Sequence, residues 1–265
     1  MTRPFAVTAA LGIVLVLTAC SSSSTQVTIE LPPAGAKFDY QLGGESAVPE
    51  GVTVVARDST VAPAGAGYDI CYVNGFQTQP ADSERFLAEE AYLVLHDAAG
   101  NPVADPAWPD EYLLDTSTAF RRSAILAAIS PAIAACAAAG YHAVEIDNVD
   151  SYTRSGELLT IEDNIALAAA YAKLAHGLGL AVAQKNGAED AARLKSEVGY
   201  DFAVAEDCAQ FAECAAYTEA YGDLVFDIEY DAAAFGTVCG TVGSAILRDR
   251  GLVVADDPAY VFQTC

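Results

Sequence analysis

The sequence predicts an α/β protein in which short parallel strands alternate with helices, and three observations support this fold class. Short runs rich in β-branched and aromatic residues alternate with alanine-rich helical stretches, which is typical of strands joined by right-handed crossovers. Beyond residue 36, no linker rich in proline, glycine or serine and no internal repeat divides the chain. Eight strand candidates over about 250 residues match the size of one (β/α)8 barrel. We therefore predict a single TIM barrel, with a doubly wound open sheet as the alternative.

The strand candidates have the length and composition of buried strands. In chain order they are residues 38–42, 52–57, 68–74, 143–147, 180–186, 201–206, 224–230 and 251–254. Three helical patterns lie between them, at residues 123–139, 161–178 and 188–196. Gly140 and Gly179 follow the first two of these patterns, and glycine is the residue that helix C-termini prefer. No G-x-G-x-x-G motif follows the first strand, which disfavours the nucleotide-binding form of the open sheet.

Residues 89–115 interrupt this alternation of strands and helices. Tyr92–His96, a turn over residues 97–102, and Val103 have the pattern of a hairpin. A stretch rich in proline that contains Trp108 follows at residues 105–111. In a barrel, this insertion would lie in the loop after the third strand, on the face where barrel active sites are built.

Acidic residues dominate the charge of the chain. It carries 13 lysine and arginine residues against 36 aspartate and glutamate residues, a net charge of −23, and 53% of its residues are apolar. The apolar content excludes a disordered acidic tail. The charge argues against a nucleic acid partner, whose phosphates need a basic surface. A cationic ligand would suit this charge, and the alternative is an acidic surface that only keeps an exported protein soluble.

The first residues have the pattern of a secretory signal peptide. Arg3 precedes an uncharged apolar stretch at residues 5–19, which is shorter than the roughly 20 residues of a membrane span. The stretch ends in Leu17-Thr18-Ala19-Cys20, which resembles a bacterial lipobox. This resemblance implies cleavage before Cys20 and lipidation of its thiol, whereas the alternative is an ordinary signal peptide with an incidental cysteine. We expect an exported protein, either lipid-anchored at the outer face of the bacterial cell membrane or secreted.

The cysteines agree with export. With Cys20 set aside, six cysteines remain, and an even number in an exported protein indicates disulfides. Several pairings are open; we favour Cys208 with Cys214 and Cys239 with Cys265, and Cys71 and Cys136 are the further candidates. No Cys-x-x-Cys motif or cysteine–histidine pair has metal-ligand spacing, so we expect neither a metal site nor a cofactor.

Carboxylates, amides and a cation lie at the ends of four neighbouring predicted strands. These residues are Glu145, Asp147, Lys185, Asn186, Glu206, Asp227 and Glu229. They would gather at one mouth of a barrel, because the carboxyl ends of parallel strands meet at the same end. A buried carboxylate is costly unless it is paired or functional. For Glu145 and Asp227 we favour a role in bracing loops, and for the set as a whole we favour a functional site.

Two acids on non-adjacent strands across one pocket are what glycoside hydrolysis requires. One acid protonates the leaving oxygen while the other stabilises or attacks the anomeric carbon. No G-x-S-x-G motif and no suitably placed histidine supports a serine or cysteine nucleophile instead. A metal-dependent hydrolase with an all-carboxylate site ranks lower, because no histidine or aspartate pair has ligand spacing.

Six ordered motifs span nearly the whole chain beyond the tether. They are Asp69–Gly75, Trp108–Asp115, Val144–Tyr152, Gln184–Asn186, Phe202–Cys208 with Glu213-Cys214, and Ile228–Tyr230. Together they resemble glycoside hydrolase family 114, the endo-α-1,4-polygalactosaminidases. The resemblance implies a TIM barrel that cleaves α-1,4-linked galactosamine, a cationic exopolysaccharide, with Asp147 and Glu206 as the catalytic pair. The chain would then consist of a signal peptide at residues 1–19, a lipidated tether at 20–36 and a catalytic domain at 37–265.

The chain departs from the family pattern at the predicted mouth. Asp110-Glu111 stands where the family has Gly-Glu, and Tyr112 stands in place of tryptophan. Residues 76–80 lack the usual acidic and basic residues, and the second strand ends in Arg57-Asp58 instead of a longer acidic motif. These differences bear on the substrate more than on the fold.

Position and chemistry suggest a role for each acid of the pair. Asp147 ends the fourth predicted strand and Glu206 the sixth, the layout of retaining α-galactosidase barrels, which this chain distantly resembles. We therefore expect Asp147 to be the nucleophile, kept ionised by Lys185, and Glu206 to be the general acid/base, kept protonated by apolar neighbours. A disulfide between Cys208 and Cys214 would brace the loop after Glu206.

The expected sugar-binding residues come from the same motifs and strand ends, and they are Asp58, Tyr72, Asn74, Trp108, Asp115, Asn148, Lys185, Asn186, Glu229 and Tyr230. Asp58, Asp115 and Glu229 are expected to bind the sugar amine through charge-assisted hydrogen bonds, which are about twice as strong as neutral ones. We expect a monomer that reaches the membrane surface only through its lipid anchor. The alternatives are a lipid-anchored carbohydrate-binding protein on an inactive barrel and a glycosidase for another α-galactosyl substrate.

Overall fold

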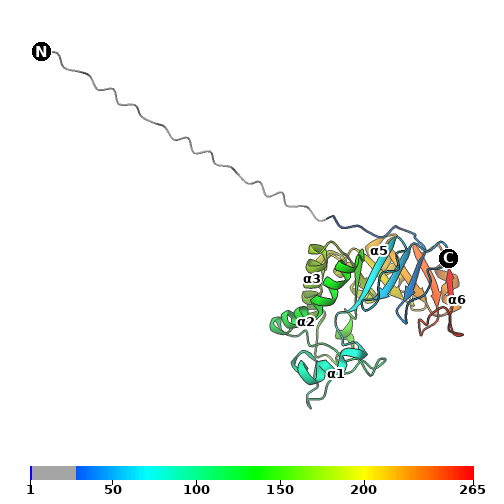
Figure 1. Cartoon of the computed structure of the whole chain (residues 1–265). Coiled ribbons are helices and arrows are strands. Elements are labelled where there is room, and N and C mark those ends of the chain that lie inside the picture. The colour runs from blue at the N-terminus through cyan, green and yellow to red at the C-terminus, as the bar shows by residue number, and fades with distance from the viewer. Residues whose placement is uncertain (2–27) are drawn as a thin grey trace.

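The computed structural model describes Met1 and residues 28–265 (Figure 1). Eight parallel strands follow one another around a barrel in chain order, and a ninth strand runs antiparallel beside the eighth. They are β1 (Phe38–Gln41), β2 (Val54–Asp58), β3 (Tyr68–Asn74), β4 (Ala143–Asp147), β5 (Ala181–Lys185), β6 (Phe202–Glu206), β7 (Val225–Glu229), β8 (Ser244–Arg248) and β9 (Phe262–Thr264). The TIM-barrel prediction is confirmed. The predicted signal peptide, Cys20 and the residues that follow it to position 27 lie outside the described residues.

The eighth strand was predicted in the wrong place, at residues 251–254. These residues form a loop, and β8 lies earlier in the chain. Ser244 and Arg248 end β8 and are polar but buried, because Ser244 Oγ donates to the carbonyl of Ala36 at 2.6 Å and Arg248 pairs with Asp39 at 2.9 Å. Among the described strands no ladder joins β8 to β1. These side-chain contacts therefore close the seam of the barrel, and β9 lies along β8 there.

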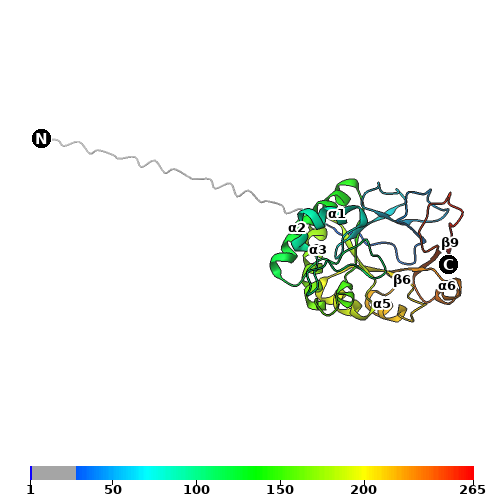
Figure 2. The same cartoon turned by 90° about the horizontal axis from the view of Figure 1, so that it is seen from below.

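The helices cover one side of the barrel more fully than the other (Figure 2). They are α1 (Pro80–Glu89), α2 (Ala119–Ala139), α3 (Ile161–Gly177), α4 (Ala191–Arg193), α5 (Cys214–Tyr221) and α6 (Ala232–Val238), with the short helices η1 (Ala91–Leu93), η2 (Ser151–Arg154), η3 (Ala188–Asp190) and η4 (Leu194–Val198). Helices α2, α3, α5 and α6 pack on β3 to β8, whereas in the described chain loops replace helices between β1, β2 and β3. The helix predicted at residues 188–196 is divided among η3, α4 and η4.

Local sequence accounts for the two long helices. The hydroxyl of Thr118 accepts from the amide of Arg121 at the start of α2, and Gly140 ends it in the left-handed conformation at φ 92°. Thr160 and Asp163 form a capping box at the start of α3. Helix α2 has the length and hydropathy of a membrane span, and here it packs against α3 and the outer side of β3 and β4.

The insertion after β3 is confirmed and forms a lobe at the mouth of the barrel. The segment of α1 stands below the strands in Figure 1. An isolated bridge joins His96 to Pro102, as the predicted hairpin requires, and another joins Val94 to Leu114, further along the insertion. Leu95, Leu113 and Leu159 form a small core of the lobe.

Two apolar layers hold the barrel together. Outside the strands, a large cluster fills the space beneath the helices. Inside, the rings of Phe38 and Phe202 pack edge to face on Phe226, with centroids 5.2 Å and 5.9 Å apart. The interior is therefore a packed core, and the inward-facing residues above it, at the carboxyl ends of the strands, form the floor of the mouth.

Candidate active site

Lys185 lies at the centre of the polar residues in the mouth. Its Nζ is 2.7 Å from Glu206 Oε2 and 3.7 Å from Asp147 Oδ1. The three residues end the adjacent strands β5, β6 and β4, and all three point into the barrel because side chains alternate along each strand. Lys185 is 3% exposed, whereas the side chains of Asp147 and Glu206 are 13% and 27% exposed. A buried cation thus bridges two carboxylates that face the opening.

Each carboxylate also accepts a hydrogen bond from a tyrosine. Tyr72 Oη, on β3, donates to Asp147 Oδ2 at 2.7 Å. Tyr230 Oη, just after β7, donates to Glu206 Oε1. Asn186 Nδ2 donates to Glu206 Oε2 at 3.0 Å, and Asn186 Oδ1 accepts from the amide of Glu206 at 2.9 Å. Both acids are therefore held in fixed orientations.

The backbone turns sharply after each of these strand ends. Asn148, Asn186 and Asp207 follow Asp147, Lys185 and Glu206, and they have φ values of 68°, 54° and 55°. Asparagine and aspartate are the non-glycine residues that adopt this left-handed conformation most readily. The local sequence therefore allows the chain to leave the barrel immediately after each functional side chain.

Lys185 lowers the pKa of Glu206 more effectively than that of Asp147. Burial would raise the pKa of Glu206, but Lys185, with the hydrogen bonds from Tyr230 and Asn186, lowers it to about 2. Burial raises the pKa of Asp147, and Lys185 and Tyr72 only partly offset this effect. In the free protein Glu206 is therefore the more strongly ionised acid. This reverses the ionisation states expected from the sequence, because the shorter contact of Lys185 is with Glu206.

Glu145 lies beneath this pair in the barrel. It is fully buried, and it accepts a hydrogen bond from Tyr40 Oη at 2.6 Å. Burial raises the pKa of Glu145 to about 8, despite the charge of Lys185. Glu145 is therefore neutral near pH 7 and braces Tyr40, in line with the structural role that we favoured.

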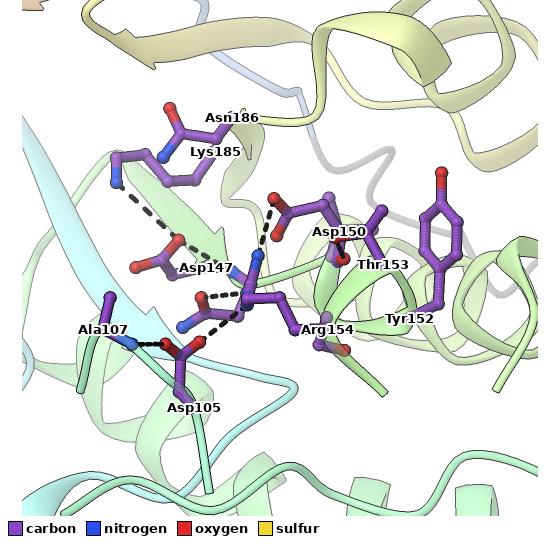
Figure 3. A network of polar contacts seen from close by, with 12 residues as sticks. Asp105, Ala107, Asp147, Asp150, Tyr152, Thr153, Arg154, Lys185 and Asn186 are labelled. Carbon is purple, nitrogen blue, oxygen red and sulfur yellow. Dashed lines mark hydrogen bonds and ion pairs between the residues drawn. The ribbon is translucent and has the colours of Figure 1, made fainter. Parts of the chain in front are cut away.

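A second polar layer joins the mouth to the insertion (Figure 3). Arg154 lies between Asp105 of the insertion and Asp150, at 2.6 Å and 2.9 Å. Its Nη2 donates to Asn148 Oδ1 at 2.9 Å. Asn148 Nδ2 then donates to Asn74 Oδ1 at 3.1 Å. These contacts fix the insertion to the strand ends beside Asp147.

The structure brings together most of the predicted site residues. Those that meet at the mouth are Tyr72, Asn74, Asp147, Asn148, Lys185, Asn186, Glu206 and Tyr230. Asp58 accepts instead from Thr60 and from Gln79 Nε2. Asp115 pairs with Arg121 at 2.7 Å, and Trp108 is 61% exposed on the insertion. No contact connects Asp58, Trp108 or Asp115 to the two acids within the described residues.

Glu229 does not face the mouth, which corrects its prediction as a sugar-binding residue. It shares the outer face of β7 with Asp227, since the inward positions are Phe226 and Ile228. Its carboxylate is fully buried and accepts from the amide of Ala209 at 2.6 Å. Glu229 therefore braces the loop after β6.

Sequence reasoning missed two residues of the mouth and one beneath its floor. Glu111 accepts from Asn74 Nδ2 at 3.1 Å, Arg154 holds Asn148, and Tyr40 contacts Glu145 beneath the floor. Glu111 lies inside a motif quoted above, so a signal for it existed. Arg154 pairs locally with Asp150, four residues earlier, but its contact with Asp105 depends on how the insertion folds, which sequence spacing does not show.

The structure contains three disulfides, Cys71–Cys136, Cys208–Cys214 and Cys239–Cys265. Both of the favoured pairs are confirmed. In the part of the chain that the structure describes, the one grouping at metal-ligand distances is Cys208, Cys214 and Asp227, and its cysteines are already joined to each other. It offers no thiolate to a metal.

Comparisons with known proteins show the family and the fold of the chain. The model of the glycoside-hydrolase family GH114 matches residues 18–265. The crystal structure of Aspergillus fumigatus Ega3 in complex with galactosamine has a TM-score of 0.68 and 21% identity, covering 91% of this chain and 100% of that one. A variant of the glycoside hydrolase domain of PelA from Pseudomonas aeruginosa has a TM-score of 0.59 and 15% identity, covering 86% and 98%. At these identities the two structures show the same fold. No curated protein sequence matches the chain.

Proposed function

The chain belongs to glycoside hydrolase family GH114 and is a glycoside hydrolase, and we propose that it cleaves polymers of α-1,4-linked galactosamine from within. The observation that carries this proposal is the pair Asp147 and Glu206, held on either side of Lys185 at the barrel mouth. The similar fold of Ega3, whose structure contains galactosamine, supports the sugar. The net charge of −23 suits a polymer of cationic sugars.

We propose that the reaction retains the configuration at the anomeric carbon. The ammonium nitrogen of Lys185 lies 2.7 Å from one carboxylate oxygen and 3.7 Å from the other. One ammonium group that contacts both carboxylates keeps them close together. Carboxyl groups about 5–5.5 Å apart are typical of retaining enzymes, whereas those of inverting enzymes are roughly 6.5–9.5 Å apart. A pair this close leaves little room for a water molecule between the acid and the sugar, and a covalent intermediate avoids that need.

In the proposed reaction Asp147 is the nucleophile and Glu206 is the general acid/base. A carboxylate oxygen of Asp147 attacks C1 as the glycosidic bond breaks, and Glu206 gives its proton to the departing sugar oxygen. Water then attacks C1, gives a proton to Glu206 and releases Asp147. Tyr72 and Tyr230 hold the two carboxylates in place through these steps.

These roles require a proton on Glu206, which in the free protein is the ionised acid. Once Glu206 is protonated, Asp147 is the carboxylate that pairs with the ammonium group of Lys185. We propose that sugar binding raises the pKa of Glu206 and so brings about its protonation. An α-galacto-configured cyclitol aziridine, which alkylates the nucleophile of retaining enzymes, should label Asp147 in a peptide map. A label on Glu206 would reverse the roles.

The substrate is tested with a reducing-end assay on partly deacetylated α-1,4-galactosaminogalactan. We expect release of reducing ends from this polymer and none from a neutral α-galactan, with α-anomeric products by NMR. Cleavage of the neutral polymer at the same rate would indicate a glycosidase for another α-galactosyl substrate. Binding to the polymer without any release would indicate a carbohydrate-binding protein.

We also propose that the protein is exported and anchored to the membrane through lipid on Cys20. Three disulfides in the barrel support an oxidising compartment. The variant Cys20→Ser should leave the membrane fraction, and continued membrane association of this variant would count against the anchor.

A further inference from the structure

Glu111 reaches the mouth from the insertion and not from a barrel strand. It is partly buried, and its Oε2 accepts a hydrogen bond from Asn74 Nδ2 at 3.1 Å. Asn74 ends β3 and is joined in turn to Asn148, the residue after Asp147. The carboxylate of Glu111 is therefore tied to the group of residues that positions Asp147.

Within the described residues, no lysine, arginine or histidine forms an ion pair with Glu111. Burial and the charge of Asp147 raise the pKa of Glu111 to about 7. A cation placed between Glu111 and Asp147 would relieve both the burial of the carboxylate and its repulsion by Asp147. The site is therefore short of one positive charge on the Asp147 side.

The other acids near Asp147 already have partners. Asp105 is held by Arg154 and by Gln77 Nε2 at 2.7 Å, and Glu206 is held by Lys185. Glu145 is buried beneath the floor of the mouth and bonded to Tyr40. Among these acids of the mouth, Glu111 is the one whose carboxylate contacts no cation and is not enclosed beneath the floor, within the described residues.

Galactosamine carries its amine on C2, the carbon next to the C1 atom that Asp147 attacks. A group that recognises the amine of the sugar being cleaved must therefore lie beside the nucleophile. We propose that Glu111 binds the ammonium group of that sugar and so selects free amines over N-acetylated ones. This inference rests on the proposed function. It replaces the amine-binding role predicted for Asp58, Asp115 and Glu229, whose carboxylates are engaged elsewhere.

The chemistry of the acetamide explains the selection. An ammonium group donates charge-assisted hydrogen bonds to a carboxylate, and these are about twice as strong as neutral ones. N-acetylation removes the positive charge of the amine. It also adds a carbonyl oxygen, which is an acceptor and forms no hydrogen bond with the carboxylate of Glu111. The cost of burying Glu111 beside Asp147 is then not offset.

The test is the variant Glu111→Gln, whose amide oxygen keeps the acceptor for Asn74 while removing the charge. We expect kcat/KM on fully deacetylated polymer to fall roughly tenfold to a hundredfold, with little change on N-acetylated stretches. The ratio of kcat/KM on the deacetylated polymer to that on the N-acetylated polymer should therefore fall. Asp110→Asn, at the exposed neighbouring acid of the same turn, is the matched control and should keep the wild-type ratio.

Two results would overturn the inference, and they differ from failure of the proposed function. If Glu111→Gln lowers kcat/KM equally on the deacetylated and the N-acetylated polymer, Glu111 only positions Asn74 and does not bind the amine. If the ratio stays at the wild-type value with both rates unchanged, Glu111 has no part in selection. If the wild-type protein releases no reducing ends from the free-amine polymer, the proposed function itself fails. Glu111→Asp should restore part of the preference, because it restores the charge.

Discussion

The acids inside the barrel mouth and the acids on the outer face of β7 are neutralised in different ways. Inside, Asp147 and Glu206 share the fixed charge of Lys185. Outside, Asp227 and Glu229 are fully buried and have no cation in contact within the described residues. Asp227 accepts from the amide of Cys208 at 3.3 Å, and Glu229 accepts from that of Ala209 at 2.6 Å.

The outer pair requires a proton where the inner pair has a lysine. Asp227 Oδ2 and Glu229 Oε2 are buried and have no donor nearby unless one of the acids is protonated. Burial, followed by the charge of Glu229, raises the pKa of Asp227. We infer that the two acids share one proton and together hold the first residues after Glu206.

The two ways of neutralising acids suit different roles, one in the proposed reaction and one in holding the loop after β6. A lysine lets the proton and the negative charge change places between two acids without altering the total charge, which a reaction in two steps requires. A shared proton neutralises the outer acids and leaves their remaining oxygens free to accept backbone amides. We infer that the outer pair positions the loop after Glu206 and takes no part in the proposed reaction.

The largest expected effect comes from the inner acids. Asp147→Asn should reduce turnover below detection, because the nucleophile is lost. Glu206→Gln should lower kcat by about 10²–10⁴-fold, and a substrate with a dinitrophenolate leaving group should recover part of that loss, since it needs no proton. Thermal unfolding should show both variants folded. Full activity of Asp147→Asn would show that Asp147 is not the nucleophile and would contradict the role proposed for the inner pair.

Removal of the bridging charge should affect both activity and stability. In Lys185→Met two buried acids lose their cation, and loss of one partner of a buried ion pair costs about 3–5 kcal/mol. The wild-type Glu206, with its pKa lowered to about 2, stabilises the fold above the pKa of the unfolded chain and loses this contribution only as pH falls toward 2. In the variant, burial without the cation raises the pKa of both acids, so the Tm should rise more steeply than that of the wild type as the pH is lowered from 8 to 5. An equal dependence of Tm on pH in the variant and the wild type would contradict this.

The smallest effect is expected from the outer pair. Because the pKa of Asp227 is raised on folding, its contribution is fully present below the unfolded pKa and is lost as pH rises toward the folded value. The wild-type Tm should therefore decline between pH 5 and pH 9. Asp227→Asn should reduce this decline in Tm and keep most of the activity. The control Asp223→Asn, at an exposed acid, should leave both the decline in Tm and the activity unchanged. If Asp227→Asn abolished turnover at every pH, the division between the two pairs would be wrong.

The strands could be predicted well because each is a short apolar run bounded by loops, and β8 shows the limit of this signal. Its sequence, Ser-Ala-Ile-Leu-Arg, is polar at both ends. Those ends are buried by partners some 208 positions earlier in the chain, which no local pattern reveals. The nearby run 251–254 is more apolar but stays only partly buried.

The site could be predicted as a set of residues but not as a set of contacts. The position of Glu229 at the end of its strand predicts a place in the mouth, but both faces of β7 are buried, so a strand end alone does not tell which face a residue is on. The stronger pairing of Lys185 with Glu206 depends on a difference in distance. The contact of Glu111 with Asn74 depends on how the insertion folds back over the strand ends. Sequence spacing carries neither kind of information.

The short strand β9 has a consequence for the solubility of the protein. A sheet edge with unpaired backbone groups is a template on which another chain can add and begin to aggregate. β9 pairs with β8 at the seam, and Cys265, directly after it, is bonded to Cys239. The covering strand is thus attached by a covalent bond at a place where the barrel has no ladder of its own. Under reducing conditions it would be held by non-covalent contacts, chiefly its three residue pairs with β8, so we expect the oxidised state to protect the protein from self-association as well as from unfolding.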